Sequence, residues 1–236
     1  MPKSRLMVGG GVDYGAEYVG GSKKRASPVL FVDYQHESGF FASFLRGIGM
    51  QKEMGDVTLS GALIYDFGRI DSRSGSSPRP GSDDLRGMGE IPGSAQAQLG
   101  VSVDLGVVNA NFAANLPLSQ RQTGRSYSMG LSGHILQSQS DQIEWEVAGL
   151  WGDRAHVQSH FGVTERQSID SGYRSYSPNA SFEQVSTKVA WVHVIDKQWS
   201  VRTAVGLLRV VGQAADSPLI KSKSTPTLTS TLNYVF

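Results

Sequence analysis

Two histidines four residues apart, His156 and His160, are the side chains best suited to chemistry in this sequence. Asp153 and Glu165 lie near them, and imidazole and carboxylate groups together can bind a metal ion or move a proton. A spacing of four residues brings two imidazoles together only on a helix, and this stretch lacks the pattern of one. We therefore expect solvated loop histidines here, with no catalytic residue, no metal site and no cofactor.

Other reactive groups are missing or badly placed. The chain has no cysteine, which excludes disulfides, thiolate metal sites and a cysteine nucleophile. The glycines of 87–93 lack the strand-to-helix context of a dinucleotide site, and the serine in 130–133 has the wrong spacing for a nucleophile elbow. We predict that the protein is not an enzyme. A lipid- or peptide-cleaving enzyme that uses His156 and His160 is the alternative.

Composition excludes two further classes. The formal net charge of +1 is too balanced for a nucleic-acid-binding protein. The longest apolar run, 189–195, is far short of the roughly 18 residues of a membrane-spanning helix. Residues 1–5 are basic but no apolar region follows them, so we expect a mature exported chain whose signal peptide has been removed.

Apolar and polar side chains alternate along most of the chain, which is the pattern of a strand with two different faces. In the last segment, for example, Leu228, Leu232 and Tyr234 alternate with Thr229 and Asn233. Eleven segments have this character, three of them less regularly. They are 5–14, 27–36, 39–49, 57–67, 97–105, 108–116, 126–135, 143–151, 185–195, 199–207 and 228–236.

The length of these segments separates two all-β folds. Strands of soluble sandwiches have about 5–6 residues, whereas strands that cross a bilayer have about 9–11, and most of these segments fit the second length. Charge in mid-strand also suits a hydrated lumen better than a sandwich core. We predict an all-β fold, in which residues 1–236 form a single closed antiparallel transmembrane β-barrel in the cell outer membrane.

Bacterial single-chain barrels have an even number of strands, so eleven segments need a correction. If the N-terminal segment 1–25 lies outside the wall, ten strands remain. If part of 69–93 crosses the membrane, there are twelve, and we prefer twelve over ten. Long connections occur near 69–93, 156–180 and 212–226, and a last strand that ends in the periplasm places all three on the outside.

Six charged side chains alternate toward the predicted lumen. They either line a narrow polar pore or pair across the interior and close it, and we prefer the paired, mostly closed interior. The pore would make the protein a small-solute channel, which is an alternative function. The six residues are Asp66, Asp104, Glu144, Glu146, Lys188 and Arg202.

Aromatic side chains favour both interfaces of a membrane with water, and outer-leaflet phosphates attract cations. We expect five aromatics at the periplasmic rim and Trp151 near the outer rim. The five are Trp145, Trp191, Trp199, Tyr234 and Phe236. Near the outer rim we expect contacts with outer-membrane lipid and lipopolysaccharide. The cations suited to them are Arg209, Lys221 and Lys223, although a solvated basic loop explains them equally well.

The sequence resembles the MipA/OmpV family of Gram-negative outer-membrane proteins over nearly the whole chain. The matching residues, in chain order, are EYVGGS at 17–22, Pro28, Tyr34, GFFAS at 39–43, Gly47, Gly49, DLRGMG at 84–89, FGVT at 161–164, SGY at 171–173, Tyr176, DSP at 216–218 and LNYVF at 232–236. One departure is the Ser/Pro-rich stretch 71–82, which is longer than the family pattern.

The resemblance implies a non-enzymatic scaffold for peptidoglycan (murein) synthesis and turnover. Its implied partners are a lytic transglycosylase and a bifunctional penicillin-binding protein. It carries over no catalytic residues. Separately, we expect the barrel-assembly machinery to bind the C-terminal strand. A surface adhesin or antigen that acts through its long outer loops is a further alternative.

Overall fold

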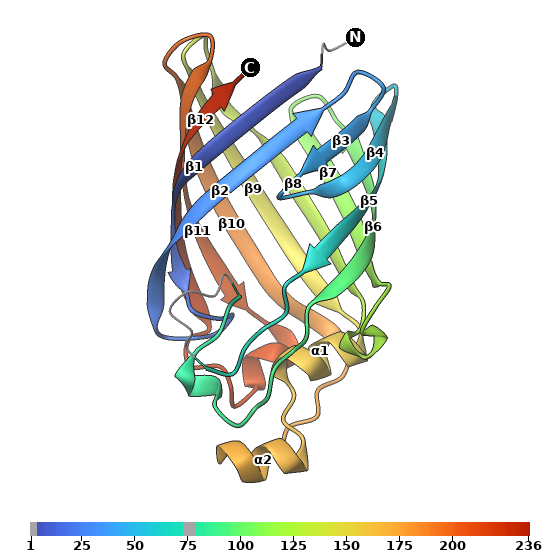
Figure 1. The fold of residues 1–236 in the computed structure, drawn as a ribbon, viewed down its shortest axis with the longest axis vertical. Coiled ribbons are helices and arrows are strands. Elements are labelled where there is room, and N and C mark those ends of the chain that lie inside the picture. The colour runs from blue at the N-terminus through green and yellow to red at the C-terminus, as the bar shows by residue number, and fades with distance from the viewer. Residues whose placement is uncertain (1–3, 73–78) are drawn as a thin grey trace.

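A computed structural model describes residues 4–72 and 79–236, in which twelve strands close an antiparallel barrel (Figure 1). Each strand pairs with its neighbours in sequence, and β1 pairs with β12 to complete the ring. The strands are β1 Arg5–Ala16, β2 Lys24–Gln35, β3 Phe40–Ser43, β4 Gly47–Met54, β5 Val57–Asp66, β6 Ser94–Asp104, β7 Val108–Pro117, β8 Ser126–Gln137, β9 Asp141–Gly152, β10 Ser181–Val194, β11 Trp199–Val210 and β12 Ser224–Val235. The predicted closed barrel of twelve strands is confirmed.

Twelve strands arise by a different route from the one expected. The first strand, β1, lies in the wall, so the expectation that the N-terminal segment 1–25 lies outside it is wrong for residues 5–16. The additional strand comes from 39–49, which folds back on itself as β3 and β4. Ser43 Oγ accepts the N–H groups of Leu45 and Arg46 in that turn, and Gly47 has a φ of 77°, which favours glycine.

The described residues of 69–93 do not cross the membrane. They hold the short 3-10 helix η1 (Asp83–Leu85) and isolated bridges that join Arg69 to Ile91 and Ile70 to Gly81. The departure from the family pattern, 71–82, lies partly outside the described residues. The described part of this connection is therefore held by isolated bridges and a short helix and adds no strand to the barrel.

Apolar side chains point out of the barrel and polar side chains point into it. Leu30, Leu63 and Val205 are 75%, 60% and 55% exposed, whereas Gln96 and Glu183 are buried. This distribution is the reverse of a water-soluble core, and it gives the wall an apolar outer surface. No helix in the described part of the chain is long and apolar enough to cross a membrane.

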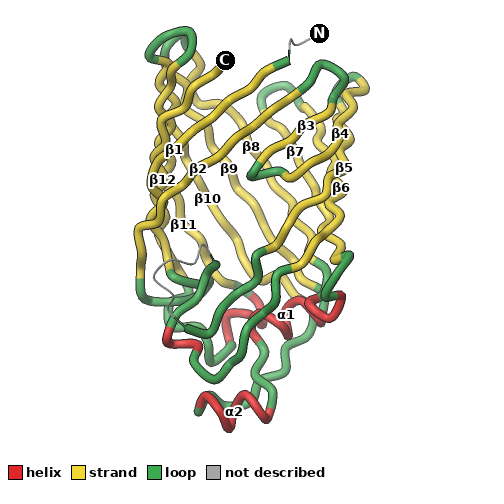
Figure 2. The backbone as a smooth tube through the Cα atoms, in the orientation of Figure 1, coloured by secondary structure: helices red, strands yellow, loops and turns green. Residues whose placement is uncertain are grey.

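The two ends of the barrel differ (Figures 1 and 2). Short turns, the start of β1 and the end of β12 gather at one end, which we call the turn end. The long connections gather at the other, the loop end, as predicted for one common side. Residues 17–23, 67–72, 79–93, 153–180 and 211–223 form what we call the loop cap.

Two helices in the loop cap contradict the expectation of solvated loops. Helix α1 (Arg154–Phe161) begins at Asp153, whose side chain accepts the N–H of His156. Helix α2 (Glu165–Ser171) begins with a capping box, in which Thr164 and Gln167 satisfy each other's backbone N–H groups. Two short 3-10 helices, η2 (Arg121–Thr123) and η3 (Gly212–Asp216), lie in other connections.

The loop cap has apolar cores of its own. One core brings together residues from four separate connections, and the other packs α1 against β11 and η3. The first contains Tyr18, Leu85, Met88, Val163 and Leu219, and the second Val157, Phe161, Val210 and Ala214. Because these side chains are buried against one another, the connections form one packed layer instead of independent loops.

Candidate functional site

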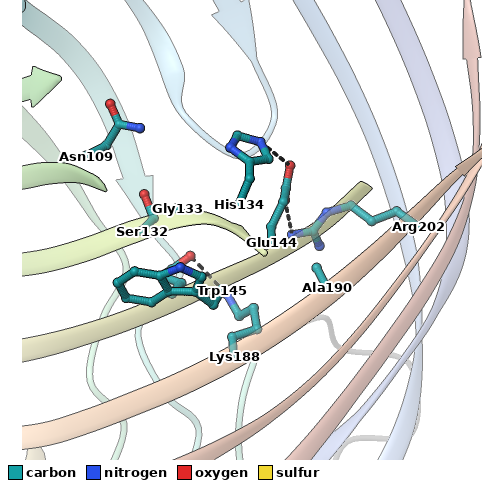
Figure 3. Close-up of a pocket in the computed structure, with 10 residues that line it drawn as sticks. Asn109, Ser132, Gly133, His134, Glu144, Trp145, Lys188, Ala190 and Arg202 are labelled. Atoms are coloured by element: carbon teal, nitrogen blue, oxygen red, sulfur yellow. Dashed lines mark ion pairs between the residues drawn. The ribbon is translucent and has the colours of Figure 1, made fainter. Parts of the chain in front are cut away.

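The inner wall carries a group of ion pairs that we call the lumen network (Figure 3). Glu144 on β9 lies 3.8 Å from His134 on β8 and 3.5 Å from Arg202 on β11. Lys188 on β10 lies 3.8 Å from Glu146 on β9. Alternation along neighbouring strands places all five side chains on one face, around a cavity of about 220 Å³.

The lumen network does not cross the interior. Its pairs join the neighbouring strands β8 to β11, so the expectation that charges pair across the lumen and close it is wrong for these residues. All five side chains are also about one-third to two-fifths exposed. Exposed pairs of this kind contribute only about 0–1 kcal/mol each, so they line a hydrated wall instead of holding it shut.

The other two predicted lumen charges lie at opposite ends of the barrel. Asp66 is at the loop end, where it accepts hydrogen bonds from the Gln96 side chain and the Gly68 N–H. Asp104 is at the turn end, where it accepts the Gly106 N–H of a short turn. The structure therefore brings four of the six predicted residues together and separates Asp66 and Asp104 from them.

A second cavity, of about 370 Å³, lies between the strand ends and the loop cap. We call it the cap cavity. Five side chains on its lining decide its chemistry: Asp66, Arg69, His156, His160 and Glu183. Three of them come from the loop cap and two from strands, so this cavity exists only because the cap packs down on the barrel.

Glu183 enters the cap cavity because of a β-bulge. The pairing of β10 with β9 shifts between Phe182 and Gln184, which leaves Glu183 as the additional residue and turns its side chain inward. Its carboxylate is 1% exposed, and Oε1 lies 3.3 Å from Nε2 of His156. Its Oε2 atom accepts no hydrogen bond from the described residues.

The histidines of α1 are packed, not solvated. The rings of His156 and His160 are stacked with centroids 4.2 Å apart, as the spacing of four residues on a helix allows. Burial, followed by repulsion from His156, lowers the pKa of His160 to about 3, so its imidazole is neutral at pH 7. The expectation of solvated loop histidines is therefore wrong.

Within the loop cap, Arg69 joins the connection between β5 and β6 to α1. Its Nη1 atom donates to the carbonyl oxygen of His160, while its Nε finds no acceptor among the described residues. Burial lowers the pKa of Arg69 to about 10, which still leaves the guanidinium charged at neutral pH. Tyr18, beside it, donates to the Leu219 carbonyl, and burial raises the pKa of its phenol.

The cap cavity lacks the contacts of a nucleophile with a base. His160 Nδ1 bonds to the backbone oxygen of His156, and no hydroxyl of the described chain bonds to either imidazole. No group of three or more metal-binding side chains occurs in residues 4–72 and 79–236. What the cavity offers is a buried carboxylate and a buried guanidinium, which favour polar or charged groups.

The predicted aromatics lie at the two ends. At the turn end, the ring of Tyr234 makes edge contacts with Trp199 and Phe236, and Trp191 Nε1 donates to Asp141. Trp145 covers Gly133 nearby. At the loop end, Trp151 packs against Tyr127.

The predicted outer-rim cations have different surroundings. Lys221 lies over the Tyr173 ring, and Lys223 is 3.7 Å from Asp216. Arg209 is the next-to-last residue of β11, and no ion pair joins it to another of the described residues. Contact of these three residues with lipopolysaccharide stays a prediction.

Sequence reasoning missed Arg69, Glu183 and Tyr18. The bulge that turns Glu183 inward leaves no mark in a pattern of alternation, and Arg69 is buried only by the folded cap. Both ends of α1 could have been predicted from the sequence, because Asp153 is a favoured N-cap residue and Gly162 follows the last turn.

The fold and the polar interior define the class of protein: an outer-membrane β-barrel. The chain matches the family described as "MltA-interacting protein MipA" over residues 8–236. It belongs to the MipA family, as the resemblance implied.

Solved barrels show only distant similarity. An anion-selective porin from Comamonas acidovorans is 10% identical, with 99% of each chain covered and a TM-score of 0.41. The KdgM porin is 9% identical over 97% of this chain and 99% of its own, with a TM-score of 0.42. The CymD monoaromatic hydrocarbon channel is 8% identical over 100% and 88%, with a TM-score of 0.43. No curated protein matches.

Proposed function

We propose that this protein is a non-enzymatic scaffold that binds murein synthesis and turnover enzymes at the inner surface of the outer membrane. The observation that carries the proposal is the packed loop cap, whose cores join four connections over one end of the barrel. A barrel covered in this way is better suited to interaction than to free diffusion of solutes. The family description, which names an interaction with MltA, points to a lytic transglycosylase as one partner.

The turn end is the side on which such a partner would dock. With the loop cap outside, the short turns, the start of β1 and the end of β12 would face the periplasm. Two apolar side chains, Leu105 and Val107, stand exposed at the turn between β6 and β7. Apolar groups at a turn tip are candidates for interface anchors, because their burial against a partner would be favourable. A bifunctional penicillin-binding protein is the second proposed partner.

Capture from envelope extracts tests the scaffold. Immobilised wild-type protein should retain a lytic transglycosylase, identified by mass spectrometry, and Val107→Glu should retain several-fold less. Arg166→Glu, at an exposed position on α2 at the opposite end, is the matched control and should behave as wild type. Removing residues 1–25 is unsuitable, because that deletes wall strand β1. Absence of any murein enzyme from the wild-type capture would count against the scaffold.

A small-solute channel is the second candidate. The hydrated lumen network and its cavity favour it, since partly exposed charges are typical of a wall in contact with water. Its test is single-channel conductance. Lipopolysaccharide contacts through Arg209, Lys221 and Lys223, and recognition of β12 by the barrel-assembly machinery, are further proposals that suit either function.

A further inference from the structure

Strands β2 and β3 are hydrogen-bonded to each other over only a short part of the wall. Strand β2 pairs with β1 along its whole length, from Lys24 to Gln35. On its other side it pairs with β3 only through Asp33, Tyr34 and Gln35. Residues 24–32 have no strand neighbour there in the described chain. Figure 1 shows the reason, because the β3–β4 hairpin is short and fills only the turn-end part of the space between β2 and β5.

The hydrogen bonds of β2 show which backbone groups face this side. Phe44 N–H donates to the Val32 carbonyl, and His36 N–H donates to the Phe40 carbonyl. Even-numbered residues of β2 therefore direct their backbone groups toward β3, and odd-numbered residues toward β1. By this alternation Ala26, Pro28 and Leu30 direct theirs to the side that lacks a strand.

Pro28 fits such an edge. Proline has no N–H, and in sheets it is confined to edges, strand starts and bulges. Here its nitrogen points to the unpaired side, so no donor is left there at this position. A proline in mid-strand would disrupt a fully paired wall, and its presence is a sequence feature that agrees with the open side.

Strand β5 forms the other edge of the space that β2 borders. Strand β4 pairs with β5 as far as Leu63, and residues 64–66 pair only with β6. Ile64 and Asp66, at this edge, also line the cap cavity. The polar interior therefore reaches the place where the wall lacks strand pairing.

An apolar groove lies on the outer surface beside the same edge. It has a volume of about 740 Å³, and Gly10 forms part of its floor. Leu30, Val32 and Phe44 line it on the side of the opening, and Trp199 and Leu232 line it on the other. These residues belong to the apolar surface that meets lipid, so the groove is continuous with the lipid-facing wall.

We propose that the wall is open to lipid between β2 and β5, and that the groove holds an acyl chain of an outer-membrane lipid whose polar end turns through the opening toward Asp66. Unsatisfied backbone groups are costly in hydrocarbon, and the polar end of an amphiphile, with its water, satisfies them. The apolar chain in turn covers Leu30, Val32 and Phe44. The ligand class is thus an amphiphile with a hydrocarbon chain.

Site-directed fluorescence in vesicles tests the opening. The chain has no cysteine, so each introduced cysteine carries the only label. Ser27→Cys is on the inward face of β2, beside the opening. Ser128→Cys is the matched control, an inward-facing serine near the loop end of β8 with paired strands on both sides. Leu30→Cys, which faces outward, reports full contact with lipid.

The label is bimane, and the vesicles contain phosphatidylcholine brominated in its acyl chains. We expect quenching at Ser27→Cys to exceed that at Ser128→Cys several-fold and to stay below that at Leu30→Cys, because the brominated chain lies in the outer groove and only the polar end enters the opening. Equal quenching at Ser27→Cys and Ser128→Cys would overturn the proposal.

Amide exchange of the unsubstituted protein in the same lipid shows whether lipid, protein or water alone lies against the free edge of β2. We expect fast exchange of the Leu30 N–H, which is directed to the side without a strand, and slow exchange of the Phe31 N–H, which is directed toward β1. Protection of Leu30 would mean that protein, such as a second copy, covers the edge, and would overturn the proposal. Fast exchange at Leu30 without quenching at Ser27→Cys would mean water alone, and would overturn it also.

Discussion

Nε2 of His156 lies 3.3 Å from Oε1 of Glu183, and their side chains are only 12% and 1% exposed where the loop cap meets the barrel. One residue belongs to α1 in the cap and the other to a bulge in strand β10. The contact joins a helix of the loop cap to a wall strand, and the alternation of apolar and polar residues along the strands does not predict it. The position of α1, and with it the closure of the loop end, depends on such contacts.

Breaking the His156–Glu183 pair should loosen the cap without unfolding the barrel. Removal of one partner leaves the other polar group buried without it, which typically costs about 1–3 kcal/mol. We expect Glu183→Gln and His156→Gln each to speed proteolysis within 153–180 in detergent micelles. Their effects should be non-additive in the double variant, since one contact is lost in each case.

The control for the pair is Arg166→Gln, on the exposed face of α2, which should leave the cleavage rate unchanged. Wild-type cleavage rates in both single variants would show that the pair does not hold α1 in place.

Acid should open the cap through His160. Burial, then repulsion from His156, lowers the His160 pKa to about 3, whereas an unfolded histidine titrates near 6.5. Between these values the opened cap binds the additional proton, so the stability that is present above about pH 6.5 is lost as the pH falls. The loss is at most about 1.4 kcal/mol for each pH unit.

Amide exchange of α1 measured between pH 7 and pH 4, corrected for intrinsic rates, checks this dependence. His160→Gln should flatten the profile, because the group that titrates is gone while Arg69, His156 and Glu183 remain. An equally steep profile in His160→Gln would assign the acid sensitivity to another group.

Arg209 should contribute most to lipopolysaccharide retention among the three outer-rim cations. Lys223 is already 3.7 Å from Asp216 and Lys221 lies over Tyr173, whereas Arg209 has no such ion pair in the described chain. A guanidinium forms charge-assisted hydrogen bonds with phosphate, and an exposed contact contributes up to about 1 kcal/mol. We expect Arg209→Gln to purify with less lipopolysaccharide than Lys223→Gln, as measured by phosphate content. Equal amounts in both would contradict this ranking.

Much of the fold was predictable because membrane strands leave a strong local pattern. Alternation of apolar and polar residues identified most wall strands. The same alternation is enough to predict which face of each strand meets lipid. The β3–β4 hairpin was harder, because Ser43 and Gly47 mark a turn inside a short apolar segment. Its consequence, a β2 edge with Pro28 at its centre, is visible only once the pairing is known.

The candidate site was less predictable, because tertiary contacts create it. Glu144, Glu146, Lys188 and Arg202 could be placed on the lumen face by counting, but which of them pair depends on strand register. Arg69 and Glu183 become buried neighbours of α1 only after the loop cap folds. No periodic pattern in the sequence encodes that layer.

Conductance in planar lipid bilayers tests closure of the loop end most directly. Leu85 is fully buried in the cap core, and Leu85→Ala should weaken that core by about 2–5 kcal/mol. A closed loop end predicts rare openings in the wild-type protein and more frequent openings in Leu85→Ala. Stable, frequent openings of the wild-type protein, unchanged by Leu85→Ala, would contradict closure and favour the channel.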